Sequence, residues 1–271
     1  MSVKKDPDGR RSIQVEVEVD GTPEQVWKAI ATGPGVSSWF VPVEVEERVG
    51  GKVVSHFGPG MDSVATVTAW DPPHRFAAES HGLGPKAPAM ATEWTVEARS
   101  GGTCVVRVVH SLFASTDDWD NQLESIESGW PAFFRILRLY LTHFAGEACT
   151  GFQTMGFAQG PVLEAWASVA GSLGLEGAAL GQQRRAPAGA PSFSGLVEAV
   201  RDGKHPYTLV LLNEPAPGAA FLTAGPMGGQ TFISISFYLY GQTANAVARR
   251  EEPLWQAWMA KHFPAASGAK S

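Results

Sequence analysis

Residues 130–144 read WPAFFRILRLYLTHF, and this stretch decides the fold. Its large apolar side chains recur at spacings of three and four residues, at Trp130, Phe134, Leu137, Leu141 and Phe144. Such spacing predicts an amphipathic helix with a broad apolar face, suited to lie on a sheet. Pro131 is expected either to begin the main helical segment or to kink it.

Upstream of this helix the chain reads as one strand, two short helices and six further strands. Residues 13–19 (IQVEVEV) alternate strictly between apolar and polar side chains, which predicts a strand with one solvated face. Thr22 and Pro23 then supply an N-cap and a proline at the first helical position. The six further strands are expected at 41–46, 52–57, 63–70, 75–80, 90–98 and 103–110. Consecutive strands joined by short turns build an antiparallel meander.

Downstream, the composition shifts toward Gly, Ala and Gln from Thr150 onward. A helix is expected over 161–173 and a final helix from Thr243, with strands at 207–213, 219–224 and 230–240. We therefore expect two domains, 12–147 and 148–271, with a linker near 181–191 in the smaller one. The smaller domain is either a shortened repeat of the first or a separate α+β unit.

Composition excludes several classes of partner. Of 271 residues, 21 are basic and 27 acidic, giving a net charge of −6, so an extended nucleic-acid surface is not expected. The two cysteines make neither a disulfide framework nor a zinc site. The first residues carry no secretory signal, and no apolar run is long enough to insert in a membrane. The expected location is the cytoplasm.

Local motifs along the first half are similar to those of a known superfamily. They are TPEQVW at 22–27, WF at 39–40, RVGGK at 48–52, DPPHR at 71–75, GGT at 101–103, VHS at 109–111 and GW at 129–130. Over residues 12–147 the chain resembles the START/Bet v allergen-like (SRPBCC) superfamily. Within it, the most similar branch is homologous to the heat-shock chaperone ATPase activator C-terminal domain. One departure is Ser80, where the family usually carries an aromatic residue; it either opens the pocket or displaces the alignment by one residue.

The resemblance implies an α+β helix-grip fold, in which a curved antiparallel sheet surrounds a long C-terminal helix. It also implies a hydrophobic small molecule held in a cavity between the sheet and that helix. Strand alternation indicates which residues face the cavity, because Glu97 and Arg107 should point to solvent. The expected ligand-binding residues are Trp39, Phe40, Phe57, Phe76, Trp94, Val106, Val108, His110, Trp130, Phe134, Leu137 and Leu141.

The alternative reading is that these aromatic residues simply fill a core. An empty apolar void of about 300 Å³ would cost on the order of 7 kcal/mol. That rivals the stability of a whole domain. Side chains, a ligand or solvent must therefore occupy the space, and the sequence alone does not decide among them.

Catalytic signals are sparse. His110 is the one weak catalytic candidate, since an inward imidazole can act as a base near neutral pH, but a core histidine hydrogen-bonded to a neighbouring backbone group is the favoured interpretation. The other histidines show no paired spacing, so no metal site is expected, and no phosphate-binding motif follows a strand, so no cofactor is expected. Asp117 and Asp118 read as helix-cap residues.

Three functions are consistent with these observations. The favoured one is non-catalytic binding of a hydrophobic small molecule. The second, implied by the resemblance, is an enzyme of the polyketide cyclase or aromatase type that uses His110. The third is a co-chaperone-like protein that docks a partner through the outer sheet face, with the acids Glu16, Glu18, Glu44, Glu46 and Glu47.

Overall fold

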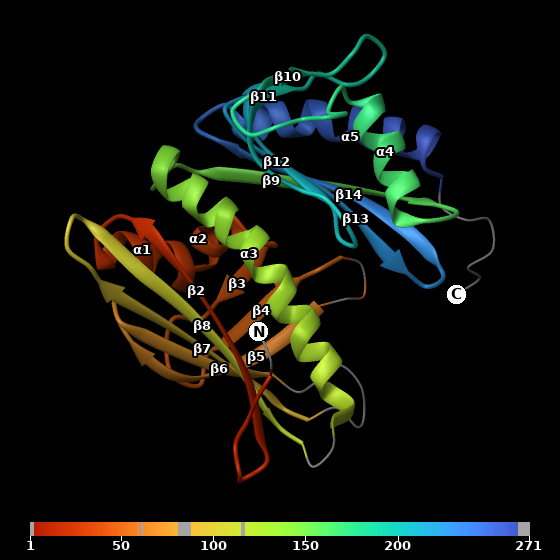
Figure 1. The fold of residues 1–271 in the computed structure, drawn as a ribbon. Coiled ribbons are helices and arrows are strands. Elements are labelled where there is room, and N and C mark those ends of the chain that lie inside the picture. The colour runs from red at the N-terminus through yellow and green to blue at the C-terminus, as the bar shows by residue number, and fades with distance from the viewer. Residues whose placement is uncertain (1–2, 59, 61, 81–87, 115–116, 265–271) are drawn as a thin grey trace. The chain divides into compact units, whose positions relative to one another are not determined.

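The chain folds as two compact units, residues 1–146 and 147–271 (Figure 1). This computed structural model describes residues 3–58, 60, 62–80, 88–114 and 117–264. Residues 115–116 lie outside the described residues, as does the side chain of Asp118, which was expected to cap a helix. Within the described ranges, no helix combines the length and hydropathy needed to cross a bilayer.

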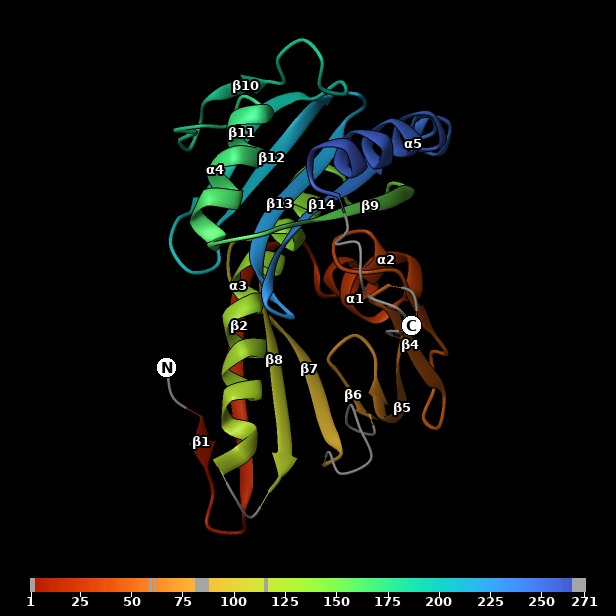
Figure 2. The same cartoon turned by 90° about the vertical axis from the view of Figure 1, so that its right-hand side faces the viewer.

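The N-terminal unit is one antiparallel sheet gripping a long helix. Its described strands are β1 (Lys4–Lys5), β2 (Arg10–Asp20), β3 (Val43–Val45), β4 (Lys52–His56), β5 (Asp62–Asp71), β6 (Arg75–Ser80), β7 (Met90–Ala98) and β8 (Thr103–Phe113). Its helices are α1 (Pro23–Ala31), α2 (Gly33–Ser37), the 3-10 turn η1 (Asp117–Trp119) and α3 (Asp120–His143). The strand order is β1-β2-β8-β7-β6-β5-β4-β3, and α3 runs along β2 (Figure 2). The predicted helix-grip fold is confirmed.

Local sequence signals explain where the helices of this unit begin. Thr22 caps α1 as predicted, accepting from the Gln25 backbone while the Gln25 side chain accepts from the Thr22 backbone N–H. Helix α3 begins ten residues before Trp130, so Pro131 lies in its interior. The residue that precedes α3 is Trp119, and it makes no side-chain cap. The expectation that Asp117 is a helix cap is therefore wrong, because its carboxylate binds Arg11 and Lys5 instead.

The C-terminal unit has a similar topology, with two strands fewer among the described residues. Its elements are β9 (Cys149–Ala158), α4 (Val162–Ser172), β10 (Gln183–Arg185), β11 (Ser194–Arg201), β12 (Tyr207–Glu214), β13 (Gly218–Met227), β14 (Gln230–Tyr240) and α5 (Ala244–His262). The order β10-β11-β12-β13-β14-β9 places the first strand beside the last, as β2 lies beside β8. A long helix, α5, again follows the last strand. Of the two readings of the smaller domain, the arrangement agrees with a shortened repeat.

Three strands of this unit, β9, β10 and β11, were not predicted, and the linker prediction is wrong in part. Residues 183–185, expected within a linker, form β10 and pair with β11. A register shift between Val197 and Ala199 interrupts the alternation that would have revealed β11. In β9 the buried positions include Thr154 and Gly156, which carry no apolar pattern in the sequence.

A buried arginine ties the start of the sheet to the start of α3. The Arg11 guanidinium donates to Asp117 and to Asp120, each at 2.6 Å, and to the carbonyl of Ala114 at 3.3 Å. Lys5 adds an ion pair of 2.8 Å to Asp120. Hydrogen bonds from Arg11 lower the pKa of Asp117, and hydrogen bonds from Lys5 lower the pKa of Asp120. These contacts hold β1 and β2 against the first turn of α3.

The substitution Arg11→Gln should lower the melting temperature of the N-terminal unit by about 5 °C at neutral pH. The two carboxylates are stabilised in their charged form, so this contribution is present above their ordinary pKa of 3.8 and is lost as the pH falls through the lowered native values. Thermal unfolding followed by circular dichroism at pH 7 and pH 3 checks both points. The matched control is Arg10→Gln, because Arg10 is an exposed neighbour. An equal loss of melting temperature in both variants would contradict the stabilising role of Arg11.

Candidate functional site

The inner face of the N-terminal sheet carries the residues predicted to face a ligand. The register pairs His110 with Thr92, and Thr92 with Ala78, so these three residues share one face. Trp94 and Val108 pair on the same face, whereas Arg107 binds Glu16 on the outer face. The predicted alternation of β7 and β8 agrees with this register. The twelve residues named for ligand binding are all buried except Phe40, which is half-buried, and Phe57, which is exposed.

An aromatic cluster fills the space directly beneath Trp130. The Trp130 ring stacks on Phe40 and on His110, each at 5.5 Å between ring centroids. The rings of Trp94 and Phe134 approach it to 5.1 and 5.4 Å. Side chains therefore occupy the room predicted under this residue. A ligand must lie beside the cluster, and contact with its buried members stays a prediction.

His110 is held by two hydrogen bonds within this cluster. The indole Nε1 of Trp130 donates to His110 Nε2 at 2.8 Å, so Nε2 carries no proton. The other nitrogen, Nδ1, lies 2.9 Å from the hydroxyl of Thr92 and must be the protonated one. Burial lowers the pKa of His110 to about 4, so the ring is neutral at pH 7. In this arrangement the imidazole has no free nitrogen to act as a base.

Polar contacts fix α3 over strand β2. Arg138 donates through Nε and Nη2 to the carbonyl of Glu18 at 3.2 and 3.0 Å. Thr142 donates to Asp20 at 3.0 Å, and the hydrogen bond from Arg11 to Asp120 holds the opposite end of the helix. Figure 2 shows the result, with α3 along β2 and with β4, β5 and β6 to its side.

The inner face away from α3 is incompletely covered. Phe57 follows β4 and is 41% exposed, although its ring packs against Phe40 at 5.9 Å between centroids. The inner-face residues of β4 and β5 are only half-buried: Val53, Ser55, Ser63 and Ala65. We call these four residues together with Phe57 the open strip. Of the strip, the sequence prediction included Phe57 alone, because small residues in a strand give no signal that the helix leaves them uncovered.

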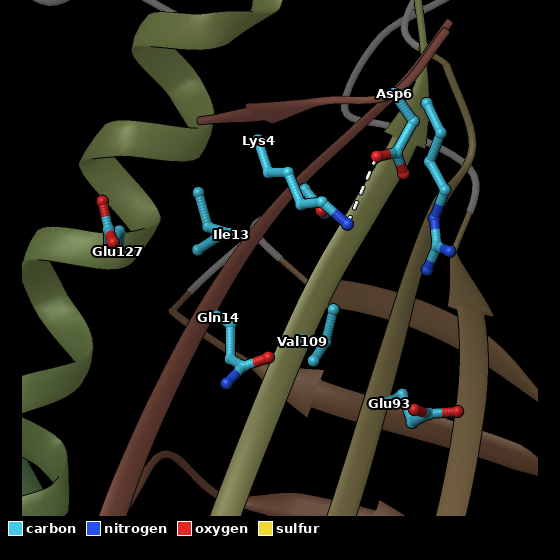
Figure 3. Close-up of a pocket in the computed structure, with 9 residues that line it drawn as sticks. Lys4, Asp6, Ile13, Gln14, Glu93, Val109 and Glu127 are labelled. Atoms are coloured by element: carbon cyan, nitrogen blue, oxygen red, sulfur yellow. Dashed lines mark ion pairs between the residues drawn. The ribbon is translucent and has the colours of Figure 1, made fainter. Parts of the chain in front are cut away.

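Two hollows formed by described residues lie elsewhere. The larger, of about 630 Å³, borders β1, β2, β7 and β8 and is drawn in Figure 3. Its charges are largely paired, with Lys4 binding Asp6 at 3.3 Å and Glu93 binding Arg75 at 2.6 Å. The smaller, of about 300 Å³, belongs to the C-terminal unit. None of the twelve predicted ligand residues lines either hollow.

The buried His110 should make stability depend on pH. Its native pKa near 4 lies below the ordinary 6.5, so the unfolded chain binds the proton more strongly and the free energy of unfolding falls as the pH drops from about 6.5 to about 4. The full effect is about 3 kcal/mol. His110→Gln, which retains a donor and an acceptor, should flatten this dependence in urea unfolding. His143→Gln, at an exposed site, is the control; an unchanged slope in His110→Gln would refute the assignment.

Comparisons with protein families and solved structures identify proteins that are similar to this chain. Residues 20–142 match the family described as Activator of Hsp90 ATPase homolog 1-like protein. The match runs from the last residue of β2 to the penultimate residue of α3. The chain matches no curated protein.

Solved structures with a similar fold have low sequence identity to this chain. DynU16, from the dynemicin biosynthetic locus, is 18% identical with a TM-score of 0.43 and covers 94% of this chain and 96% of its own. Aha1 from Colwellia psychrerythraea is 20% identical with a TM-score of 0.42, over 50% of this chain and 98% of its own. CalU16 from Micromonospora echinospora is 18% identical with a TM-score of 0.42, over 52% and 83%. Over residues 20–142, the N-terminal unit is similar to the family described as Activator of Hsp90 ATPase homolog 1-like protein.

Proposed function

We propose that the N-terminal unit binds a small hydrophobic molecule against the open strip, beside the aromatic cluster. The observation that carries this proposal is an exposed phenylalanine, Phe57, next to inner-face residues that a fully covered sheet would bury. An apolar ligand would remove this surface from water, which is favourable in proportion to the area covered. The family match covers the same N-terminal unit, which supports placing the function there.

The chemistry of the open strip suits a mostly apolar ligand with a few polar groups. Phe57 and Val53 offer apolar surface, while Ala65 leaves room above the sheet. Ser55 and Ser63 pair directly with each other and carry hydroxyls that can orient a polar group of the ligand. Sites of this kind combine an apolar lining with a small number of placed polar groups.

An order-of-magnitude estimate sets the size of the ligand. At about 25 cal/mol per Å² of apolar area, micromolar affinity needs more than about 330 Å² of apolar contact, before the costs of association. A ligand that also reached the half-buried ring of Phe40 would cover more apolar surface.

A chaperone or other protein partner is the second candidate, because the matching family is named for activators of a chaperone ATPase. The acids expected to form that surface are partly engaged within the unit. Glu16 binds Arg107 at 3.2 Å, and Glu46 binds Arg48 at 2.8 Å. This internal pairing weakens the outer face as an acidic docking surface.

The enzyme hypothesis has less support. A reaction that used His110 as a base would first have to break its bond with Trp130 or with Thr92. The binding proposal requires no such rearrangement.

The binding proposal is tested by filling the open strip. Ala65→Trp places an indole on the inner face, whereas Thr66→Trp places the same group on the exposed outer face of β5. The wild type should bind the dye 8-anilinonaphthalene-1-sulfonate saturably, and Ala65→Trp should weaken this by about tenfold, equivalent to 1.4 kcal/mol. Thr66→Trp should leave it unchanged. Fluorescence titration measures the affinities, and circular dichroism checks that both variants fold.

Two results would contradict this proposal. One is the absence of saturable dye binding to the wild type. The other is equal binding by wild type and Ala65→Trp. Recovery of a chaperone from a pull-down that Glu16→Lys abolishes and Ala65→Trp leaves intact would instead favour the protein partner.

A further inference from the structure

The smaller hollow lies wholly in the C-terminal unit and has no role in the function proposed above. It is formed by α4, the loop that follows α4, and the adjoining ends of β11 and β12. Its lining consists of Trp166, Ala167, Ala170, Leu175, Glu176, Gly177, Ala178, Val200, Asp202, Tyr207 and Thr208. A volume of about 300 Å³ is at the lower end of small-molecule sites.

The hollow exists because α4 leaves one end of the sheet uncovered. Thr208 pairs with Leu222, which belongs to the core under the helices, and Val200 pairs with Thr208. Val200 therefore lies on the core-facing side of the sheet, yet it is 39% exposed. Helix α4 contacts β13 and β14 instead of this end of β11.

The floor of the hollow is apolar and includes an aromatic ring. Leu175 is buried, Trp166 is half-buried and Val200 is exposed. Trp166 lines the hollow, and the face of an indole attracts cations. The floor is therefore suited to the apolar part of a ligand, with a positive charge beside the indole ring.

The lining carries two carboxylates and no basic side chain. Glu176 and Asp202 are both exposed, and neither has an ion pair within the described part of the chain. Two arginines contact residues of the lining without belonging to it. Arg184 donates to the carbonyl of Gly177 at 3.0 Å, and Arg201 donates to the carbonyl of His205 at 2.7 Å. The guanidinium of Arg201 also lies over the Tyr207 ring, 4.9 Å from its centroid.

We propose that this hollow binds a small organic cation, an ammonium group attached to an apolar or aromatic body. The body would lie on Val200 and Leu175, the ammonium group would lie near Trp166, and the carboxylates of Glu176 and Asp202 would supply the complementary charge. An anionic ligand of the same shape is disfavoured, because both charged groups of the lining would repel it.

The test compares three ligands of nearly equal shape on the full chain. They are 3-phenylpropylammonium, 3-phenylpropan-1-ol and 3-phenylpropanoate, and nuclear magnetic resonance titration measures their affinities. The cation should bind saturably, the alcohol several-fold more weakly, and the carboxylate not at all. Glu176→Gln combined with Asp202→Asn should weaken the cation by about fivefold, since exposed ion pairs are individually modest. It should not change binding of the alcohol.

Glu164→Gln is the matched control, because Glu164 is an exposed acid on α4 that does not line the hollow. It should leave all three affinities unchanged. Trp166→Leu should weaken the cation more than the alcohol. The proposal is overturned if the cation fails to bind saturably, if the three ligands bind equally, or if the double variant and Glu164→Gln behave alike.

Discussion

The hydrogen bond from Trp130 to His110 organises the N-terminal unit. A buried indole N–H needs an acceptor, and an unprotonated imidazole nitrogen supplies one at 2.8 Å. The same bond ties the middle of α3 to β8 and places the Trp130 ring where Phe40, Trp94 and Phe134 pack against it. Since burial keeps His110 neutral, no second charge is needed to balance it. Side chains fill the space at this point, whereas the neighbouring open strip is less covered.

The two units share a topology but not the polar chemistry of their cores. In the C-terminal unit the long helix also carries a buried tryptophan, Trp255, whose Nε1 has no hydrogen-bond partner among the described residues. One turn away, Oε2 of the buried Glu251 is also without one there. Each such atom costs about 1–3 kcal/mol unless a water molecule satisfies it. Repetition of the strand order therefore does not repeat the polar chemistry of the core, and each unit is interpreted from its own side chains.

Periodicity predicted the elements that follow a simple pattern. The alternation in residues 13–19 and the helical spacing after Trp130 correspond to β2 and to the second half of α3. The start of the main segment of α3 was left open, because Pro131 could either begin that segment or kink it; the helix begins at Asp120, and Pro131 lies in its interior. Strand β11 was missed because a register shift breaks its alternation, and β9 because Thr154 and Gly156 occupy buried positions. Sequence patterns show whether a side chain favours burial or exposure. A register shift, or the burial of a small residue, depends on the neighbouring strands, so the pattern of one strand does not show it.

The candidate sites were harder to predict than the fold, for a related reason. Strand alternation tells which face a residue takes, but it does not tell how far a helix covers that face. Here the coverage depends on polar contacts at the helix surface, above all Arg138 with the carbonyl of Glu18. In a helical pattern such an arginine reads as a solvated residue. Because it anchors α3 over β2, the small side chains of β4 and β5 stay partly exposed, and a surface for a ligand arises from residues that carry no motif of their own.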